Sequence, residues 1–354
     1  MIRRPRCPIC LGESASNVGM FLAPWFMALA EISPTDGFVS IRRCTSCEFW
    51  WSDRGIIDRE VSCVYSGYRG GQYTKIRKRF EPWYLKRHNQ DRTVNDVIRY
   101  RRDLTPAAIE EWFASRPSLK VLDFGGGTGE MIPQWAKDQT NYVVDESIRN
   151  RQEGANAISL DEAKMLRFDV VTAMHVAEHL DDPVGQLLTL AGLLETGGLV
   201  YVEVPLDGTD LPFRQPLIDN RFAQRSLRWV HRTSFSSVIC QAAWILSDFV
   251  VTGCQLLSPI RVRRLKISEH INYFSERAMW RLGAEAGLDQ IATVYLRPDR
   301  AGKAVRCQEG SLGMWFRKGE TKRETTDDCV DGLGAAQDDE QILPCAGKAG
   351  VCFR

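Results

Sequence analysis

The stretch Val121–Glu130, VLDFGGGTGE, decides the fold, because a short apolar run breaks there into four glycines within five positions. Glycines have no Cβ, so the backbone can turn tightly and approach a ligand closely. When a strand ends in such a turn and a helix follows, backbone N–H groups and the helix N-terminus face that ligand. The pattern predicts a nucleotide-like cofactor at the carboxyl end of this strand.

Two cofactor classes use such a turn, a dinucleotide and S-adenosylmethionine. The dinucleotide fingerprint G-x-G-x-x-G ends in glycine or alanine. Counted from Gly125, that last position is Glu130. The sequence therefore fits a dinucleotide poorly, and S-adenosylmethionine is the better candidate.

Apolar, β-branched runs alternate with helical segments through residues 105–318. The runs are LKVLDFG, YVVDES, FDVVTAMHV, GGLVYVEVP, IATVYLRP and GSLGMWFRK. Short apolar strands separated by helices indicate a parallel sheet covered on both faces, which is an α/β fold. Ligands bind such sheets at the carboxyl ends of the strands, where the glycine turn lies.

The glycine turn resembles the first motif, D-x-G-x-G-x-G, of class I S-adenosylmethionine-dependent methyltransferases. The segments FDVVTAMHVAEHLDDP and LLETGGLVYVEVP resemble that family's fourth and fifth strands with their turns. The resemblance implies a Rossmann-like, seven-stranded sheet with an antiparallel last strand. It also implies an acidic residue that accepts both ribose hydroxyls, here Asp145, and places His175 beside the methionine end of the cofactor. The cofactor-binding residues implied are Asp123, Gly125, Gly126, Gly127, Gly129, Asp145 and His175.

Two C-x-x-C pairs stand near the start of the chain, Cys7 with Cys10 and Cys44 with Cys47. Two such pairs can converge on one tetrahedral metal ion, and zinc is the metal that four thiolates indicate. Because four thiolates leave no open position for a substrate, we expect a structural role in a zinc-ribbon-like module over residues 1–70.

Residues 71–104 are rich in Lys and Arg with aromatic residues between them, and we interpret them as a basic helical linker. The segment fits a solvated helix face with an aromatic core stripe. It also fits a surface that contacts phosphate, on a nucleic acid or on a nucleotide-linked substrate. The formal net charge of the chain is +1, so no nucleic-acid partner is expected.

An insertion over residues 206–266 follows the predicted fifth strand and is the best candidate for an inserted helical lid over the acceptor. Its long apolar stretch has Asp248 as the single charged residue and is flanked by basic residues. Asp248 argues against a membrane span. A lid, a dimerisation element and peripheral contact of residues 235–260 with an anionic membrane all remain open.

The segment Ser268–Ser275, SEHINYFS, together with the cysteine pairs, resembles a narrower group. That group contains zinc-bearing methyltransferases of bacterial sugar and polysaccharide pathways, including sugar-nucleotide C-methyltransferases. An E-H pair in that group supplies a histidine base, which implies catalytic roles here for Glu269 and His270. Ile267 and Ser268 stand where the C-methyltransferases have Tyr-His, so O-methylation remains an alternative.

The function expected is S-adenosylmethionine-dependent methyl transfer, with Zn²⁺ as a second cofactor, to a sugar, nucleotide-sugar or polysaccharide-linked acceptor. One alternative is O-methylation of a small lipid-like aromatic. Another is a zinc-ribbon module that binds nucleic acid or protein beside a methyltransferase-like scaffold.

The first residues, MIRRPRCPIC, lack the apolar run of a secretory signal, so we expect a cytoplasmic protein, with a membrane-peripheral position left open. In that compartment the eleven cysteines are expected to be thiols or metal ligands. Residues 319–354 show no periodicity and are expected to be a disordered tail. No sequence feature indicates an oligomeric state.

Overall fold

A computed structural model describes most of the chain. The described residues are 2–82, 84, 107–129, 131–146, 155–206, 221–257, 266–296 and 311–319. The predictions for most of the basic linker, for the ends of the insertion at 207–220 and 258–265, and for the tail from 320 onward lie outside these residues.

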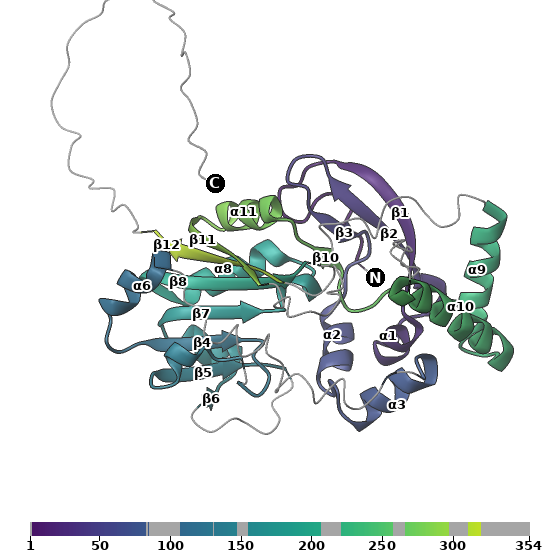
Figure 1. Ribbon diagram of the computed structural model, residues 1–354, viewed down its shortest axis with the longest axis horizontal. Helices are drawn as coiled ribbons and strands as arrows, with labels where there is room; N and C mark the ends of the chain where they lie inside the picture. Colours follow the sequence, from purple (N-terminus) through teal and green to yellow (C-terminus); the bar gives the residue numbers. More distant parts are fainter. Residues whose placement is uncertain are drawn as a thin grey trace, which may run out of the picture. The chain divides into compact units, whose positions relative to one another are not determined.

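A seven-stranded mixed sheet forms the larger layer, in the order β11-β12-β8-β7-β4-β5-β6 (Figure 1). Its strands are β4 (Lys120–Phe124), β5 (Thr140–Val144), β6 (Ala155–Ala157), β7 (Phe168–Met174), β8 (Leu194–Pro205), β11 (Leu288–Leu296) and β12 (Ser311–Lys318). β4 to β8 pair in parallel, while β12 is antiparallel to both β8 and β11. The predicted α/β fold with an antiparallel last strand is confirmed.

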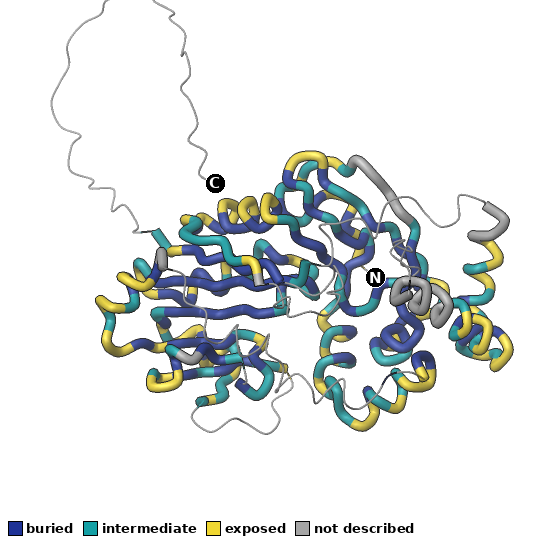
Figure 2. Tube along the Cα trace, viewed as in Figure 1, coloured by how far each residue is buried: buried dark blue, intermediate teal, exposed yellow. Residues whose placement is uncertain are grey.

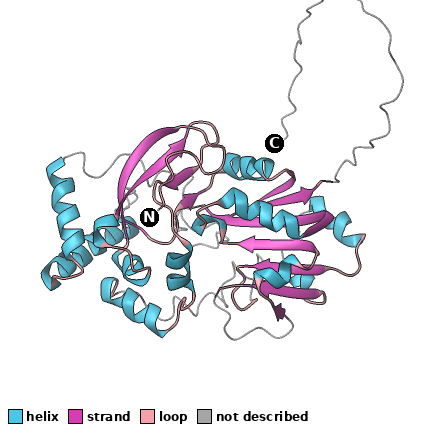
Figure 3. Cartoon of the chain, turned by 180° about the vertical axis from the view of Figure 1, so that it is seen from behind, coloured by secondary structure: helices cyan, strands magenta, loops and turns pink. Residues whose placement is uncertain are grey.

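Helices lie across this sheet, as the view from behind in Figure 3 shows. They are α6 (Ala107–Ala114), α7 (Leu160–Lys164), α8 (Pro183–Leu193) and α11 (Glu276–Glu285), with the short turn η2 (Gln134–Ala136). Val170 and Val171 follow one another in β7, so they face opposite sides, and both are fully buried. Both faces of the sheet are therefore covered, which explains why its strands are continuous apolar runs (Figure 2).

A second, five-stranded sheet has the order β10-β3-β2-β1-β9. Its strands are β1 (Ser14–Leu22), β2 (Phe38–Cys44), β3 (Trp50–Ser52), β9 (Lys266–Ile267) and β10 (Asn272–Tyr273). Three helices and a short turn join it, namely α1 (Pro24–Leu29), η1 (Pro34–Asp36), α2 (Asp58–Tyr65) and α3 (Gly71–Phe80). Both edge strands come from residues 266–273, so the N-terminal module positions the segment that carries Glu269 and His270.

The described part of the insertion is helical, as predicted, and forms α9 (Arg221–Thr233) and α10 (Val238–Leu257). These helices pack on the N-terminal sheet: His231 Nε2 lies 3.0 Å from the carbonyl oxygen of Leu22. The His231 ring is flanked by Phe21 and Trp244, each with its ring centre 4.9 Å away. Within the described residues, no helix combines the length and the apolar character that a membrane crossing requires.

Candidate cofactor and acceptor site

The glycine turn follows β4 and adopts backbone angles that other residues rarely take. The φ angle is +71° at Gly125, +57° at Gly127 and +84° at Gly129. A Cβ on Gly126 would lie 2.1 Å from Asp123 Oδ2, and one on Gly125 would lie 2.5 Å from Val176 Cγ2. A Cβ on Gly127 would meet no heavy atom within 4 Å. The turn thus requires glycine and presents an open backbone surface at Gly127, which fits a cofactor lying directly on it.

Two aspartates flank this turn. The N–H group of Gly127 donates a hydrogen bond to Asp145 Oδ2 over 2.8 Å, and Asp145 immediately follows β5. Asp123 is buried and accepts a hydrogen bond from Thr172 Oγ1 over 2.9 Å. Asp123 therefore packs beneath the glycine turn as a buried residue, while Asp145 lies beside Gly127 at the edge of the turn.

His175 follows β7 and has a φ of +57°, which a non-glycine residue seldom adopts. Its Nδ1 hydrogen-bonds Glu178 Oε1 over 3.2 Å, and its Nε2 pairs with Glu203 Oε1 over 3.2 Å. Both glutamates are fully buried. Burial by itself lowers the pKa of His175, but the hydrogen bonds and charges of Glu178 and Glu203 outweigh it and raise the pKa to about 9. His175 is therefore held as a cation beside Val176, which contacts the glycine turn.

The segment that carries Glu269 and His270 is bonded to the loop after β7, which contains the short helix η3 (Ala177–His179). The N–H of Ile271 donates to the carbonyl oxygen of Glu178 over 2.9 Å. His179 Nδ1 lies 3.1 Å from the carbonyl oxygen of Glu269, so Nδ1 carries the proton of this bond. The rings of His179 and His270 are 4.8 Å apart between centres. The predicted catalytic pair therefore lies at the carboxyl ends of the parallel strands.

The N-terminal module adds Tyr65, at the end of α2, to this group. Its ring centre lies 5.6 Å from that of His179. Burial, together with the charge of Glu269, raises the pKa of Tyr65 well above its ordinary value. Tyr65 Oη, Glu178 Oε2 and Glu269 Oε2 are buried and have no hydrogen-bond partner among the described residues. Buried polar atoms are costly to leave unpaired, so these three atoms fit a polar ligand.

Arg4 joins the N-terminal module to the loop after β7 and to the segment that carries Glu269 and His270. Its Nη1 donates to Asn272 Oδ1 over 2.9 Å and to the carbonyl oxygen of Asp181 over 3.1 Å. Burial lowers the pKa of Arg4 to about 10, against the opposing effect of Asp181, so the guanidinium keeps its charge near neutral pH. Because Asn272 also donates to the carbonyl oxygens of Ala177 and Leu180, one buried network fixes the loop geometry.

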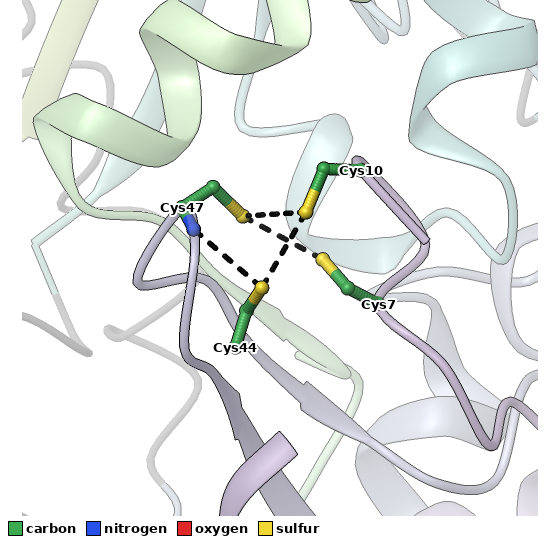
Figure 4. A group of neighbouring side chains, drawn as sticks. All are labelled: Cys7, Cys10, Cys44 and Cys47. Carbon is green, nitrogen blue, oxygen red and sulfur yellow. Dashed lines mark hydrogen bonds between the residues drawn. The ribbon is translucent and has the colours of Figure 1, made fainter. Parts of the chain in front are cut away.

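The four cysteines of the N-terminal pairs point toward one another from two turns of the chain (Figure 4). The Sγ–Sγ distance is 3.6 Å for Cys7–Cys47, 3.4 Å for Cys10–Cys44 and 3.6 Å for Cys10–Cys47. The N–H of Ser46 also donates to Cys44 Sγ over 3.3 Å. Zinc with Zn–S bonds of about 2.3 Å requires sulfur atoms roughly 3.8 Å apart, so the cluster has the dimensions of a tetrahedral zinc site.

A second group of potential metal ligands lies where the loop after β7 meets the segment that carries Glu269 and His270. Atoms of Glu178, His179 and His270 that can bind a metal ion are all within 4.8 Å of one another. Two imidazoles and one carboxylate can hold a divalent ion.

A family model described as a methyltransferase domain matches residues 97–293, which is more than half of the chain. The chain belongs to the methyltransferase domain family. It is an S-adenosylmethionine-dependent methyltransferase. No curated protein matches the chain.

Solved structures of other methyltransferases also match the chain, at low identity. The N-methyltransferase NodS from Bradyrhizobium japonicum WM9 is 15% identical, with a TM-score of 0.35, and the match covers 65% of this chain and 99% of NodS. The 1,6-didemethyltoxoflavin-N1-methyltransferase from Burkholderia thailandensis is 17% identical, with a TM-score of 0.38, and the match covers 66% and 84%. At these identities and TM-scores the two matches say nothing about the acceptor of this chain.

The residues of this methyltransferase that the sequence singled out gather at two places. One group lies around the carboxyl ends of the parallel strands and consists of Asp123, the four glycines, Asp145, His175, Glu269 and His270. The four cysteines form the separate cluster.

Sequence reasoning missed Glu178, Glu203 and Tyr65. Glu203 is a charge inside an apolar strand, VYVEVP, and such a residue is rarely buried without a partner. That signal would have indicated a buried partner for Glu203, which the structure shows to be His175.

Proposed function

We propose that this methyltransferase acts on a sugar, nucleotide-sugar or polysaccharide-linked acceptor, with His270 and Glu269 at the acceptor's reacting position. The observation that supports this most is the bonding of the Glu269–Tyr273 segment to the loop after β7. It brings an imidazole and a carboxylate to the same end of the sheet as the glycine turn.

The cofactor side consists of the glycine turn, Asp145 and His175. S-adenosylmethionine, when bound, supplies a methyl group already activated by its sulfonium. The open backbone at Gly127 gives the cofactor a surface to lie on, and the Asp145 carboxylate can accept hydrogen bonds from ribose hydroxyls. His175, fixed between Glu178 and Glu203, holds the loop after β7 in one conformation. These contacts orient the donor for in-line transfer.

On the acceptor side, His270 takes a proton from a hydroxyl or from a carbon next to a ketone, and Glu269 orients the acceptor. An imidazole suits this task because its ordinary pKa lies close to neutral pH. The buried polar atoms of Tyr65, Glu178 and Glu269 favour an acceptor with several hydroxyl groups over a flat apolar ring, since a ring would leave them unpaired. The choice between C- and O-methylation depends on which proton His270 can reach.

Zinc bound to the four cysteines stabilises the module that supplies Tyr65, Arg4 and three strands of the smaller sheet. The domain division proposed is a zinc-binding module over 1–70, a basic linker over 71–104, a catalytic domain over 105–318 with the insertion 206–266, and a tail over 319–354.

The test is transfer of a labelled methyl group from S-adenosylmethionine to a panel of acceptors. The panel contains nucleoside-diphosphate sugars with and without a ring ketone, a lipid-linked glycan, and a flat apolar phenol. Labelled sugar supports the proposal, and labelling of the phenol alone would overturn it. Where a keto sugar is labelled, mass spectrometry of the product distinguishes methyl on carbon from methyl on oxygen.

A divalent metal ion held by Glu178, His179 and His270 is the second candidate role for this site. Such an ion would occupy the lone pair on the imidazole nitrogen of His270, and His270 needs that lone pair to accept a proton. Metal content separates the two roles: the base role predicts one zinc per chain in both the wild type and His270→Ala. Two equivalents, one of which is lost in His270→Ala, would assign the residues to metal binding.

A further inference from the structure

An exposed apolar stripe runs along α10. Its members, spaced as on one face of a helix, are Val238, Ile239, Ala242, Ala243 and Leu246. Val238 and Ile239 are each 82% exposed, and Leu246 is 63% exposed. The opposite face of the helix carries Cys240 and Trp244, which are buried. The inner face of α10 already packs against the N-terminal module. The outer stripe therefore does not contribute to the hydrophobic core of the described chain.

The neighbouring helix α9 also exposes basic side chains and a tryptophan. Trp229 is 63% exposed. Arg225, Arg228 and Arg232 are also exposed, and the guanidinium of Arg228 lies over the ring of Phe38 at 3.8 Å from its centre. The exposed side of α9 thus carries an aromatic ring with a polar N–H and several cations.

The C-terminal end of α3 extends the basic border. Gln241 of α10 donates through Nε2 to the carbonyl oxygen of Arg79 over 2.9 Å, and the rings of Phe80 and Phe235 are 5.6 Å apart. Lys75, Lys78 and Arg79 are exposed. Neither 71–80 nor 221–247 contains an Asp or a Glu, and Asp248 is the one acidic residue of α10. The charged residues of these two segments are therefore all basic.

We propose that this face, formed by α9, the described part of α10 and the end of α3, docks on an anionic lipid bilayer. The aliphatic stripe enters the boundary between head groups and acyl chains, as the apolar face of an interfacial helix does. Trp229 lies at the level of the head groups, where its ring and its N–H are both accommodated. The arginine and lysine side chains extend along the surface and contact anionic lipid phosphates.

Charge and chemistry disfavour the other occupants. In a two-fold dimer the same patch faces itself, so Arg225, Arg228 and Arg232 would approach the same arginines without an acidic partner from these segments. A nucleic acid would satisfy the cations but would leave Val238, Ile239 and Leu246 without apolar contact. Of these three occupants, an anionic bilayer is the one that provides both an apolar interior and a negative surface.

The experiment is co-sedimentation of the full chain with vesicles of phosphatidylcholine and with vesicles that also contain phosphatidylglycerol. The patch variant is Ile239→Glu with Leu246→Glu. A matched control is Met165→Glu with Leu188→Glu, which adds the same charge at exposed apolar positions just after α7 and on α8 (84% and 49% exposed). A charge variant is Arg225→Gln with Arg232→Gln. Affinity for S-adenosylhomocysteine shows that each variant is folded.

Wild type and control are expected to bind the anionic vesicles with similar affinity and to be released by high salt. The patch variant should bind at least about tenfold more weakly, and so should the charge variant, because each basic residue near an anionic surface adds to affinity. Equal binding by wild type and patch variant, or none by wild type, would overturn the proposal. So would a dimer in sedimentation velocity that the patch variant abolishes, or patch-dependent binding to DNA instead of vesicles.

Discussion

Gly127 donates its backbone N–H to Asp145 Oδ2 over 2.8 Å, and this bond joins the turn after β4 to the end of β5. A second backbone bond, from the N–H of Gly125 to the carbonyl oxygen of Val144 over 2.7 Å, joins the same two strands. The acidic side chain is thus fixed relative to the glycine backbone in the structure itself. Such preorganisation reduces the ordering that a cofactor must otherwise bring about when it binds.

Asp145→Ala should weaken binding of S-adenosylhomocysteine by about tenfold or more, because hydrogen bonds to a charged acceptor contribute roughly 1.5–3 kcal/mol. Calorimetric titration measures the change. Asp161→Ala is the matched control, since that carboxylate is 91% exposed and pairs with Lys164 on α7. Equal affinities for the two variants would remove Asp145 from the cofactor site.

Gly126→Ala and Gly127→Ala should differ in their effect on stability. A Cβ on Gly126 collides with the buried carboxylate of Asp123, whereas one on Gly127 meets nothing and carries only the strain of a positive φ. That strain is about 1–2 kcal/mol, so urea unfolding should show a larger loss for Gly126→Ala. Gly127→Ala should chiefly weaken cofactor binding. A greater loss of unfolding free energy in Gly127→Ala would contradict this geometry.

Cys44→Ser should lower the zinc content of the purified protein from about one equivalent and reduce its thermal stability, because a structural site loses one of four thiolates. Cys63→Ser is the control, since Cys63 is a free cysteine on α2 outside the cluster. Elemental analysis measures the zinc content, and calorimetry measures the temperature of unfolding. Full metal content in Cys44→Ser would show that the four thiols do not share one ion.

His231 should make the protein less stable in mild acid. Burial lowers its pKa from 6.5 to about 4, against the opposing hydrogen bond to Leu22. Between these values the unfolded chain binds a proton that the folded chain does not. Stability is therefore full above about pH 6.5 and is lost as pH falls toward 4. When the pH is lowered from about 7.5 to about 5, the free energy of unfolding should fall by about 1–2 kcal/mol less in His231→Gln than in wild type. Urea unfolding at each pH measures this difference. Parallel pH profiles would show that His231 titrates normally.

Six of the seven strands of the larger sheet could be predicted from apolar runs, because these signals are local, whereas β6 has only three residues and shows no such run. An apolar run such as Val121–Phe124 followed by glycines needs only neighbouring residues to be recognised, and the structure places β4 and its turn there. The cysteine pairs are local in the same way, since each C-x-x-C turn directs its own sulfurs. The residues that specify such elements are neighbours in the sequence, so the elements can be recognised without knowledge of distant contacts.

The second sheet could not be predicted in the same way. β9 and β10 are two residues each, too short to show a period, and β9 pairs with β1 across most of the chain. The contact of Arg4 with Asn272 likewise depends on long-range folding. For this reason the sequence identified Glu269 and His270 through a resemblance, whereas the contribution of Tyr65 beside them became visible only in the structure.

The most direct test of the proposed site is the rate of methyl transfer by His270→Asn on the best acceptor of the panel, at saturating cofactor and acceptor. If His270 moves the proton, the rate should fall at least about a hundredfold, while affinity for S-adenosylhomocysteine stays within about twofold of wild type. A control, His231→Gln, should keep the wild-type rate at neutral pH. A His270→Asn enzyme that retains the wild-type rate would contradict the assignment of the Glu269–His270 segment to the acceptor.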